Sequence, residues 1–234
     1  MKIEQLKNYG KPLNETTRSF PFPTMAVIVK DALWVLVKNL GLATSFKVLR
    51  DTREEKARMS AVNLDEIREN GCSDEVFIAH MAQAAAFFSS MKNHIGLEKT
   101  MEVHRKIMDK VAGPMNLAIL PPASDIRKFR GKQEEFAAFR QYVLALWEAD
   151  QQAGLHKFDL VENSDQALAI NVNYCAYSRI PQLLGVGDAC ECYCYSDEVF
   201  FPGFLEPFGI RFVRNQTLGR KGTQCDFRFE KTAE

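Results

Sequence analysis

The chain has 234 residues, of which 46% are apolar and 26% charged, and its formal net charge is zero. These values are ordinary for a globular protein and argue against nucleic acid as the main partner, because phosphate binding needs clustered Lys and Arg. No stretch approaches the roughly 20 uninterrupted apolar residues of a membrane span, and residues 1–7 lack the apolar segment of a secretory signal. We therefore expect a cytoplasmic protein without a membrane partner, whose cysteines are reduced thiols.

The pattern of the first two thirds of the chain predicts a helical scaffold. Four breakers, Gly10, Pro12, Pro21 and Pro23, predict an irregular arm over residues 1–23. The following part, 24–153, is expected to be helical. Its apolar periodicity, capping residues and glycines predict helices over 25–50, with an interruption at Gly41, and over 74–94, 98–111 and 133–150. A polar stretch is expected over 50–58.

At Gly154 the pattern changes from helical to alternating. Period-two alternation predicts strands over 156–162 and 167–173, joined by the turn residues Asn163-Ser164-Asp165. Two short helices are expected over 176–184 and 187–200, and two more strands over 210–214 and 225–229. The predicted fold class is α+β, with a helical N-terminal part followed by a small antiparallel-sheet domain with two short helices over 154–234.

Five of the six cysteines lie between positions 175 and 225, inside this second part. Cys175 ends the second expected strand. The reactive or charged groups on the later helix and strand pair are Cys194, Asp197, Arg214, Cys225 and Asp226. If the strands form one sheet, these groups can meet at one edge or face. A thiol becomes a useful nucleophile when a cation or a helix N-terminus lowers its pKa.

Each cysteine also has a structural interpretation, because reduced cysteine often packs as a small buried apolar residue. Cys190 fits that interpretation best, since nothing chemical lies beside it in the sequence. The spacing of Cys190, Cys192 and Cys194 does not match a zinc site, whose cysteines are usually separated by two or more residues. We therefore expect no metal and no cofactor. Among the four histidines, His156 is the one expected to approach the cysteines.

Four segments carry a family resemblance: Cys175-Ala-Tyr, Cys194-Tyr-Ser-Asp197, Phe212-Val-Arg214-Asn-Gln-Thr217-Leu218 and Gly222-Thr-Gln-Cys225-Asp226-Phe227-Arg228-Phe229. With them, the chain resembles the L-2-amino-thiazoline-4-carboxylic acid hydrolase family over roughly residues 70–230. The last segment is the most specific, and its ending is also similar to vinyl-reductase-type ligand-binding domains. The resemblance implies opening of a cyclic amidine, from an aminothiazoline carboxylate to N-carbamoyl-cysteine. Cys190, Cys192 and the Pro-rich arm depart from the family pattern.

These observations predict a hydrolase that opens a small-molecule heterocycle at a cyclic amidine or amide C–N bond. The expected catalytic residues are Cys175, Asp197 and Cys225. The expected substrate-binding residues are Arg214, Cys194, Asp226 and His156. Two alternatives stay open: a non-catalytic small-molecule sensor of the vinyl-reductase type, and a different small-ring reaction on the same fold, by an isomerase, lyase or reductase. A homo-oligomer also stays open, since the apolar helix over 76–94 can pack internally or against a second subunit.

Overall fold

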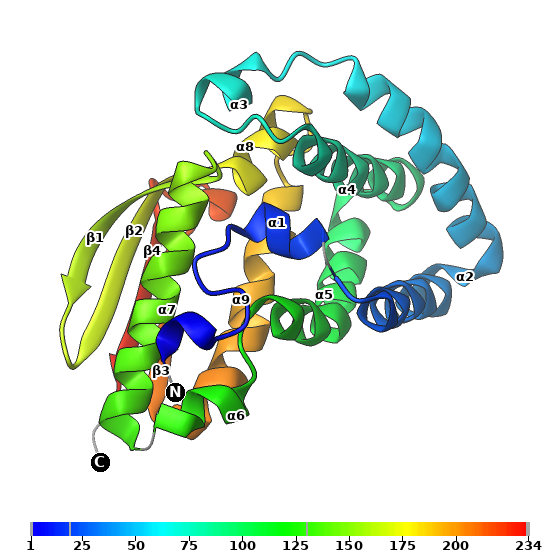
Figure 1. Cartoon of the computed structure of the whole chain (residues 1–234). Helices are drawn as coiled ribbons and strands as arrows, with labels where there is room; N and C mark the ends of the chain where they lie inside the picture. Colours follow the sequence, from blue (N-terminus) through cyan, green and yellow to red (C-terminus); the bar gives the residue numbers. More distant parts are fainter. Residues whose placement is uncertain (1, 19, 130, 233–234) are drawn as a thin grey trace.

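The computed structural model describes residues 2–18, 20–129 and 131–232. Helices dominate the chain up to residue 152, and a four-stranded antiparallel sheet with two helices follows, which confirms the α+β class (Figure 1). The elements in chain order are η1 (Ile3–Gln5), α1 (Leu13–Arg18), α2 (Phe22–Ser60), α3 (Asp65–Glu69), α4 (Glu75–Ile95), α5 (Leu97–Ile119), α6 (Ala123–Ile126), η2 (Arg127–Phe129), α7 (Lys132–Gln152), β1 (His156–Asn163), β2 (Ala167–Cys175), α8 (Ala176–Leu183), α9 (Ala189–Leu205), η3 (Glu206–Phe208), β3 (Ile210–Val213), η4 (Leu218–Arg220) and β4 (Cys225–Lys231).

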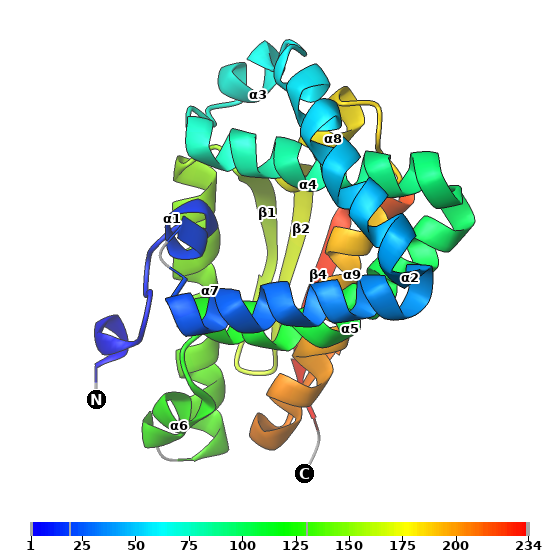
Figure 2. The same cartoon turned by 90° about the vertical axis from the view of Figure 1, so that its right-hand side faces the viewer.

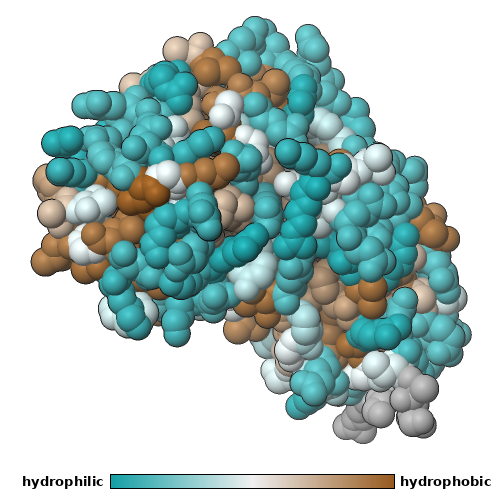
Figure 3. All heavy atoms as spheres, turned by 180° about the vertical axis from the view of Figure 1, so that it is seen from behind, coloured by the Kyte–Doolittle hydropathy of each residue, from teal (hydrophilic) through white to brown (hydrophobic). Residues whose placement is uncertain are grey.

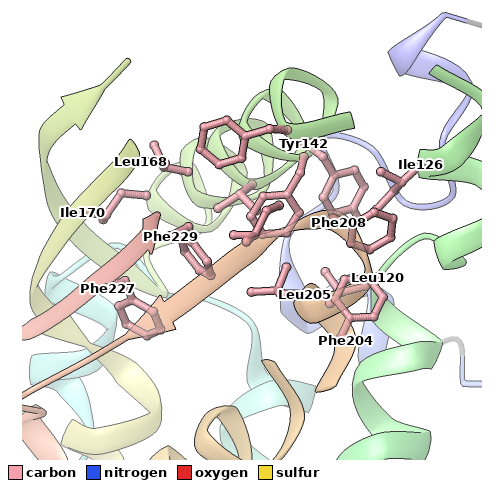
Figure 4. Packing of buried hydrophobic residues seen from close by; sticks show 14 of the residues in the cluster. Leu120, Ile126, Tyr142, Leu168, Ile170, Phe204, Leu205, Phe208, Phe227 and Phe229 are labelled. Carbon is pink, nitrogen blue, oxygen red and sulfur yellow. The ribbon is translucent and has the colours of Figure 1, made fainter. Parts of the chain in front are cut away.

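The sheet has the strand order β1-β2-β4-β3, and every neighbouring pair is antiparallel. Leu168 of β2 pairs with Phe229 of β4, and Ile170 pairs with Phe227. These side chains lie on one face, because residues two apart on a strand point to the same side. Helices α7 and α9 supply the apolar residues that cover this face, and Figure 4 shows the resulting packing.

Two further apolar clusters connect the remaining helices. One joins α4 to α8 and α9 through residues such as Phe77, Met81 and Ile180, and the other packs α2 against α4 and α5. The core on the sheet also takes in Leu6, from the beginning of the chain. Gly154 therefore marks a change of secondary structure, while the apolar clusters continue across it.

The expectation of an irregular arm over 1–23 needs correction. This stretch contains η1, α1 and the beginning of α2. It is also anchored, since Leu6 is buried and the Asn8 side-chain amide donates to the carbonyl of Ile119 at 2.8 Å. Pro12 and Pro21 come immediately before helices, a position where proline's fixed φ and missing N–H do little harm.

Two helices are longer than the sequence predicts. Helix α2 continues to Ser60, so the expected polar stretch over 50–58 is helical. Gly41 interrupts α2 as predicted, with φ 74° and ψ 164°, and Figure 2 shows the two halves of the helix running in different directions. Helix α5 continues through Pro114 to Ile119, where burial of Ala118 and Ile119 compensates for the N–H that proline lacks.

The outer face of α2 carries most of the exposed large apolar side chains in the described part of the chain. Figure 3 shows apolar atoms gathered on the left, the side on which α2 lies when the view of Figure 1 is turned round. The residues are Phe22, Met25, Val27, Val29, Leu33, Trp34, Leu42, Phe46 and Leu49. Among the described helices, none combines the length and apolar character that crossing a membrane requires.

Candidate active site

Three side chains from successive elements meet where α7, β1 and β2 join. Asp150 lies in the last turn of α7, and His156 is the first residue of β1. The Asp150 Oδ2 and His156 Nδ1 atoms are 3.0 Å apart, and both side chains are almost fully buried. Cys175, the last residue of β2, pairs directly with His156 in the sheet, and its interaction with the imidazole contributes to raising the pKa of His156. The result is a carboxylate–imidazole–thiol series of the kind used in nucleophilic catalysis.

The turn between Asp150 and His156 depends on Gly154. Its φ is +69°, a left-handed conformation that side chains disfavour. A Cβ atom at this position would lie 2.2 Å from the carbonyl carbon of Gly71, so the backbone of the loop between α3 and α4 leaves no room for a side chain here. The Leu155 N–H closes the turn by donating to the carbonyl of Asp150 at 2.8 Å. This tight connection brings the end of α7 beside the first residue of β1.

The environment of His156 favours its protonated form. Burial opposes the charge, but the charge of Cys175 and the hydrogen bond that His156 donates to Asp150 together raise the pKa of His156 to about 10. Trp147 and Tyr177 flank the ring, at centroid distances of 4.7 and 5.8 Å. Cys175 also occupies the N-cap of α8, at the N-terminal end of that helix.

A second group of polar side chains surrounds Arg214, which directly follows β3. Its guanidinium is 1% exposed and donates to Asp197 Oδ2 at 2.6 Å, to the carbonyl of Cys194 at 2.6 Å and to Glu198 Oε1 at 3.2 Å. Burial raises the pKa of Asp197, while Arg214 and the charge of His156 oppose that rise.

Cys194 and Cys225 form a coupled pair of thiols in this second group. The hydrogen bond from Cys225 lowers the pKa of Cys194 to about 7, although burial opposes this, and Arg214 and Thr217 add to the lowering. The same interaction, together with burial, raises the pKa of Cys225 well above its usual range. The Sγ atom of Cys225 also accepts the Leu218 N–H at 3.2 Å. Cys194 is thus the member of this pair that ionises first.

The structure shows the surroundings of three residues expected at the site. Arg214, expected to bind a substrate carboxylate, is buried and donates to Asp197, Glu198 and the Cys194 carbonyl, while its Nε atom has no hydrogen-bond partner among the described residues. Asp226, expected to contact substrate, accepts the backbone N–H groups of Asn215 and Gln216 at 3.0 and 2.8 Å, so it holds the turn that follows Arg214. Cys225, expected to be catalytic, is buried and remains protonated at neutral pH.

The other cysteines have no visible chemical role. Burial raises the pKa of Cys72 to about 11, and it raises those of Cys190 and Cys192 to about 12. All six cysteines are free thiols. Within the described residues, no three His, Cys, Asp or Glu side chains are grouped so that they could hold a metal ion.

Sequence reasoning missed Asp150 and Glu198. Asp150 stands six residues before His156, across a turn that brings its carboxylate back to the imidazole. An acidic residue in the last turn of a helix, followed by a glycine and a histidine, is a weak indication of an Asp–His pair, because helix ends often carry charged residues. Glu198 follows Asp197 and connects Arg214 to Arg220, whose guanidinium it accepts at 2.6 and 3.0 Å.

Replacing Arg214 by methionine is expected to destabilise the fold by about 2 kcal/mol, because it leaves the acidic pair Asp197 and Glu198 without its buried partner. This value lies below the cost of breaking a fully buried pair, since both carboxylates keep about a quarter of their side-chain surface exposed. Urea unfolding of the variant and the wild type measures the difference in the free energy of unfolding. The control is Arg211→Met on β3, whose exposed pair with Glu230 contributes less than about 0.5 kcal/mol. Equal losses for the two variants would contradict the prediction.

A pocket of about 780 Å³ lies on the outer side of η4 and is lined in part by Glu191, Leu218 and Arg220. Gly219, which also lines this pocket, lies close to Cys194, because a Cβ atom on Gly219 would lie 2.8 Å from the Cys194 Sγ atom. The absence of a side chain at Gly219 therefore lets η4 lie directly against the thiol.

Comparison with known proteins places these groups in a family context. The family model for L-2-amino-thiazoline-4-carboxylic acid hydrolase matches residues 75–229, about two thirds of the chain, and includes both polar groups of the site. Comparison with curated proteins and with solved structures gives no match.

Proposed function

This chain belongs to the L-2-amino-thiazoline-4-carboxylic acid hydrolase family, and on that basis we propose that it hydrolyses a small cyclic amidine of the 2-aminothiazoline type with Cys175 as nucleophile. The observation that carries the proposal is the buried Asp150–His156 pair beside Cys175. An activated thiol needs a base within hydrogen-bond reach and a third group that orients the base. Cys175 is also partly accessible, as a nucleophile must be.

In the first step, the Cys175 thiolate attacks C2, the amidine carbon between the ring sulfur and the ring nitrogen. The tetrahedral adduct collapses by breaking the C2–S bond of the ring. His156 gives its proton to the departing ring sulfur, which becomes the thiol of the opened product. The enzyme is left as an isothiouronium adduct on Cys175, and His156 is neutral.

In the second step, neutral His156 takes a proton from water, and the hydroxide attacks the same carbon. The adduct collapses by expelling the Cys175 thiolate, and its hydroxyl group releases a proton to water as the carbonyl forms, which leaves a carbamoyl group on the nitrogen. The site returns to its thiolate–imidazolium state, and the net reaction adds one water. Asp150 holds the imidazole in one tautomer through both steps, with Nδ1–H toward its carboxylate and Nε2 toward the reacting atoms.

The bond that breaks in the proposed reaction is the C2–S bond of the ring. N-carbamoyl-cysteine keeps both nitrogens of the amidine on the carbonyl carbon and carries a free thiol. Its formation from the thiazoline ring therefore breaks a C–S bond, and the C–N bond expected from the sequence stays intact.

Asp197 is proposed to bind the positively charged amidine. Burial raises the pKa of Asp197 above its usual value, whereas for Glu198 the effect of burial is outweighed by Arg220 and Arg214, which lower its pKa; a quarter of the Asp197 side chain is accessible. A carboxylate that is already paired with Arg214 is fixed in orientation and can accept an N–H from the substrate through its remaining lone pairs. By binding the amidine, Asp197 would hold C2 in line with the thiolate, and such orientation of the reacting atoms lowers the barrier to attack.

The test is turnover by the purified protein. We expect 2-amino-thiazoline-4-carboxylate to gain the mass of one water and to yield a product that reacts once with a thiol-alkylating reagent. Mass spectrometry of the alkylated mixture measures both. A panel of cyclic amidines and imides without ring sulfur serves as the control, because C–N cleavage produces no thiol.

Two other results would point to the alternatives. Saturable binding of these compounds without any mass change indicates a sensor of the vinyl-reductase type and contradicts the proposed chemistry. A mass change other than the addition of water indicates an isomerase, lyase or reductase on the same fold.

A further inference from the structure

The carboxylate of Asp150 is held from two sides. Its Oδ2 atom faces His156 Nδ1, and its Oδ1 atom accepts the backbone N–H of Leu13 at 2.6 Å. Asp150 is 1% exposed, so water gives this carboxylate little help. A buried carboxylate is stable only when its oxygens find donors. The Leu13 N–H meets that need without adding a charge that would compete with the imidazole.

The segment that carries Leu13 is fixed to the body of the protein at several points. The Asn14 side-chain amide donates to Asp74 Oδ2 at 2.5 Å, and Arg18 forms an ion pair with the same carboxylate. Asp74 in turn caps α4 by accepting the N–H groups of Val76 and Phe77. On the other side, Asn8 is bonded to the end of α5. These ties place the Leu13 amide in a defined position against Asp150.

We propose that residues 3–18 complete the active site, with the backbone amide of Leu13 as a positioning group that holds Asp150 toward His156. The segment lies outside the part of the chain that carries the family's match. This inference rests on the proposed function for its catalytic meaning, while the contact itself can be tested without substrate.

The Leu13 N–H matters because the carboxylate of Asp150 can rotate about its terminal bond. An imidazole needs one carboxylate oxygen in line with its Nδ1–H. A donor on the other oxygen resists rotation about the last bond of the aspartate and keeps that line. Without the donor, the Asp150–His156 hydrogen bond weakens, and with it a contribution that raises the pKa of His156. The other titratable groups around His156 are Cys175, Tyr177 and Asp197, and none of them contacts Leu13 through a described hydrogen bond.

The decisive variant is Leu13→Pro, which removes the N–H. Leu13 is the first residue of α1, a position where proline is tolerated. Leu13→Ala is the matched control, because it also loses the side chain but keeps the N–H. We expect Leu13→Pro to lower kcat about 10-fold relative to Leu13→Ala with little change in KM, the effect typical of removing a group that orients a functional ligand. The alkaline limb of kcat/KM, near pH 10 in the wild type, should move to lower pH only in Leu13→Pro.

NMR titration of the His156 imidazole supplies a readout that does not depend on turnover. A lower pKa for His156 in Leu13→Pro than in Leu13→Ala supports the inference even if no substrate is turned over, in which case the failure belongs to the proposed function. Equal titration curves for the two variants overturn it.

Asp74→Ser provides a second variant if Leu13→Pro does not fold. Serine preserves the cap of α4, because its hydroxyl accepts the same N–H groups, but it releases Asn14 and Arg18. The expected result is a shift of the His156 titration in the same direction. An unshifted titration in this variant counts against the inference.

Discussion

Cys175→Ala is expected to lower kcat/KM for ring opening by at least about 10³-fold, because it removes the nucleophile and leaves only orientation and electrostatic stabilisation. The effect should fall on kcat, since Asp197, the proposed amidine-binding group, is unchanged in the variant. The measurement is steady-state kinetics with 2-amino-thiazoline-4-carboxylate. Mass spectrometry of wild-type protein stopped during turnover should also show the isothiouronium adduct on the peptide that contains Cys175, and the variant should show none.

Two other cysteine variants make this test specific. Cys192→Ala removes a buried thiol of raised pKa that packs against Met101 of α5, and it should retain wild-type turnover. Cys194→Ala is the critical comparison, because Cys194 has the most acidic thiol that the structure identifies. We expect a smaller loss for it than for Cys175→Ala. A larger loss, with the adduct on the Cys194 peptide, would move the nucleophile to the second polar group and contradict our assignment.

Asp150→Asn is expected to lower kcat by about 10⁴-fold, the scale seen when the acid that orients a catalytic imidazole becomes an amide. An amide that donates to His156 favours the wrong tautomer, and one that accepts from it lacks the negative charge. Because Asp150 raises the pKa of His156, its loss lowers that pKa, and the alkaline limb of kcat/KM should move downward from about pH 10.

The control for charge is Glu148→Gln, two residues earlier on the same helix and exposed. It removes one negative charge from α7 without touching the imidazole, so activity and pH profile should stay at wild-type values. A loss below about 10-fold for Asp150→Asn would mean that Asp150 has only a structural role, since its buried contacts would then account for the whole effect.

The sequence correctly predicts the elements whose pattern is local. Alternation over the strands, the glycine at the interruption of α2 and the change of pattern at Gly154 all appear in the structure. The irregular arm was the main error, because proline at a helix start and proline in a loop look alike in a sequence. Contacts with distant residues such as Ile119 and Asp150 decide between them.

For the site, the sequence by itself determined which residue types were available: a cluster of thiols, two carboxylates and an arginine in the last quarter of the chain. Only the tertiary structure decided which of them meet. The sheet register brings His156 opposite Cys175, and the Gly154 turn brings Asp150 to the imidazole. Arg214, which the sequence offered as a substrate ligand, is buried against Asp197 in the folded chain. Charge, tautomer and nucleophilicity depend on distance and burial, and these arise from long-range packing that no local pattern records.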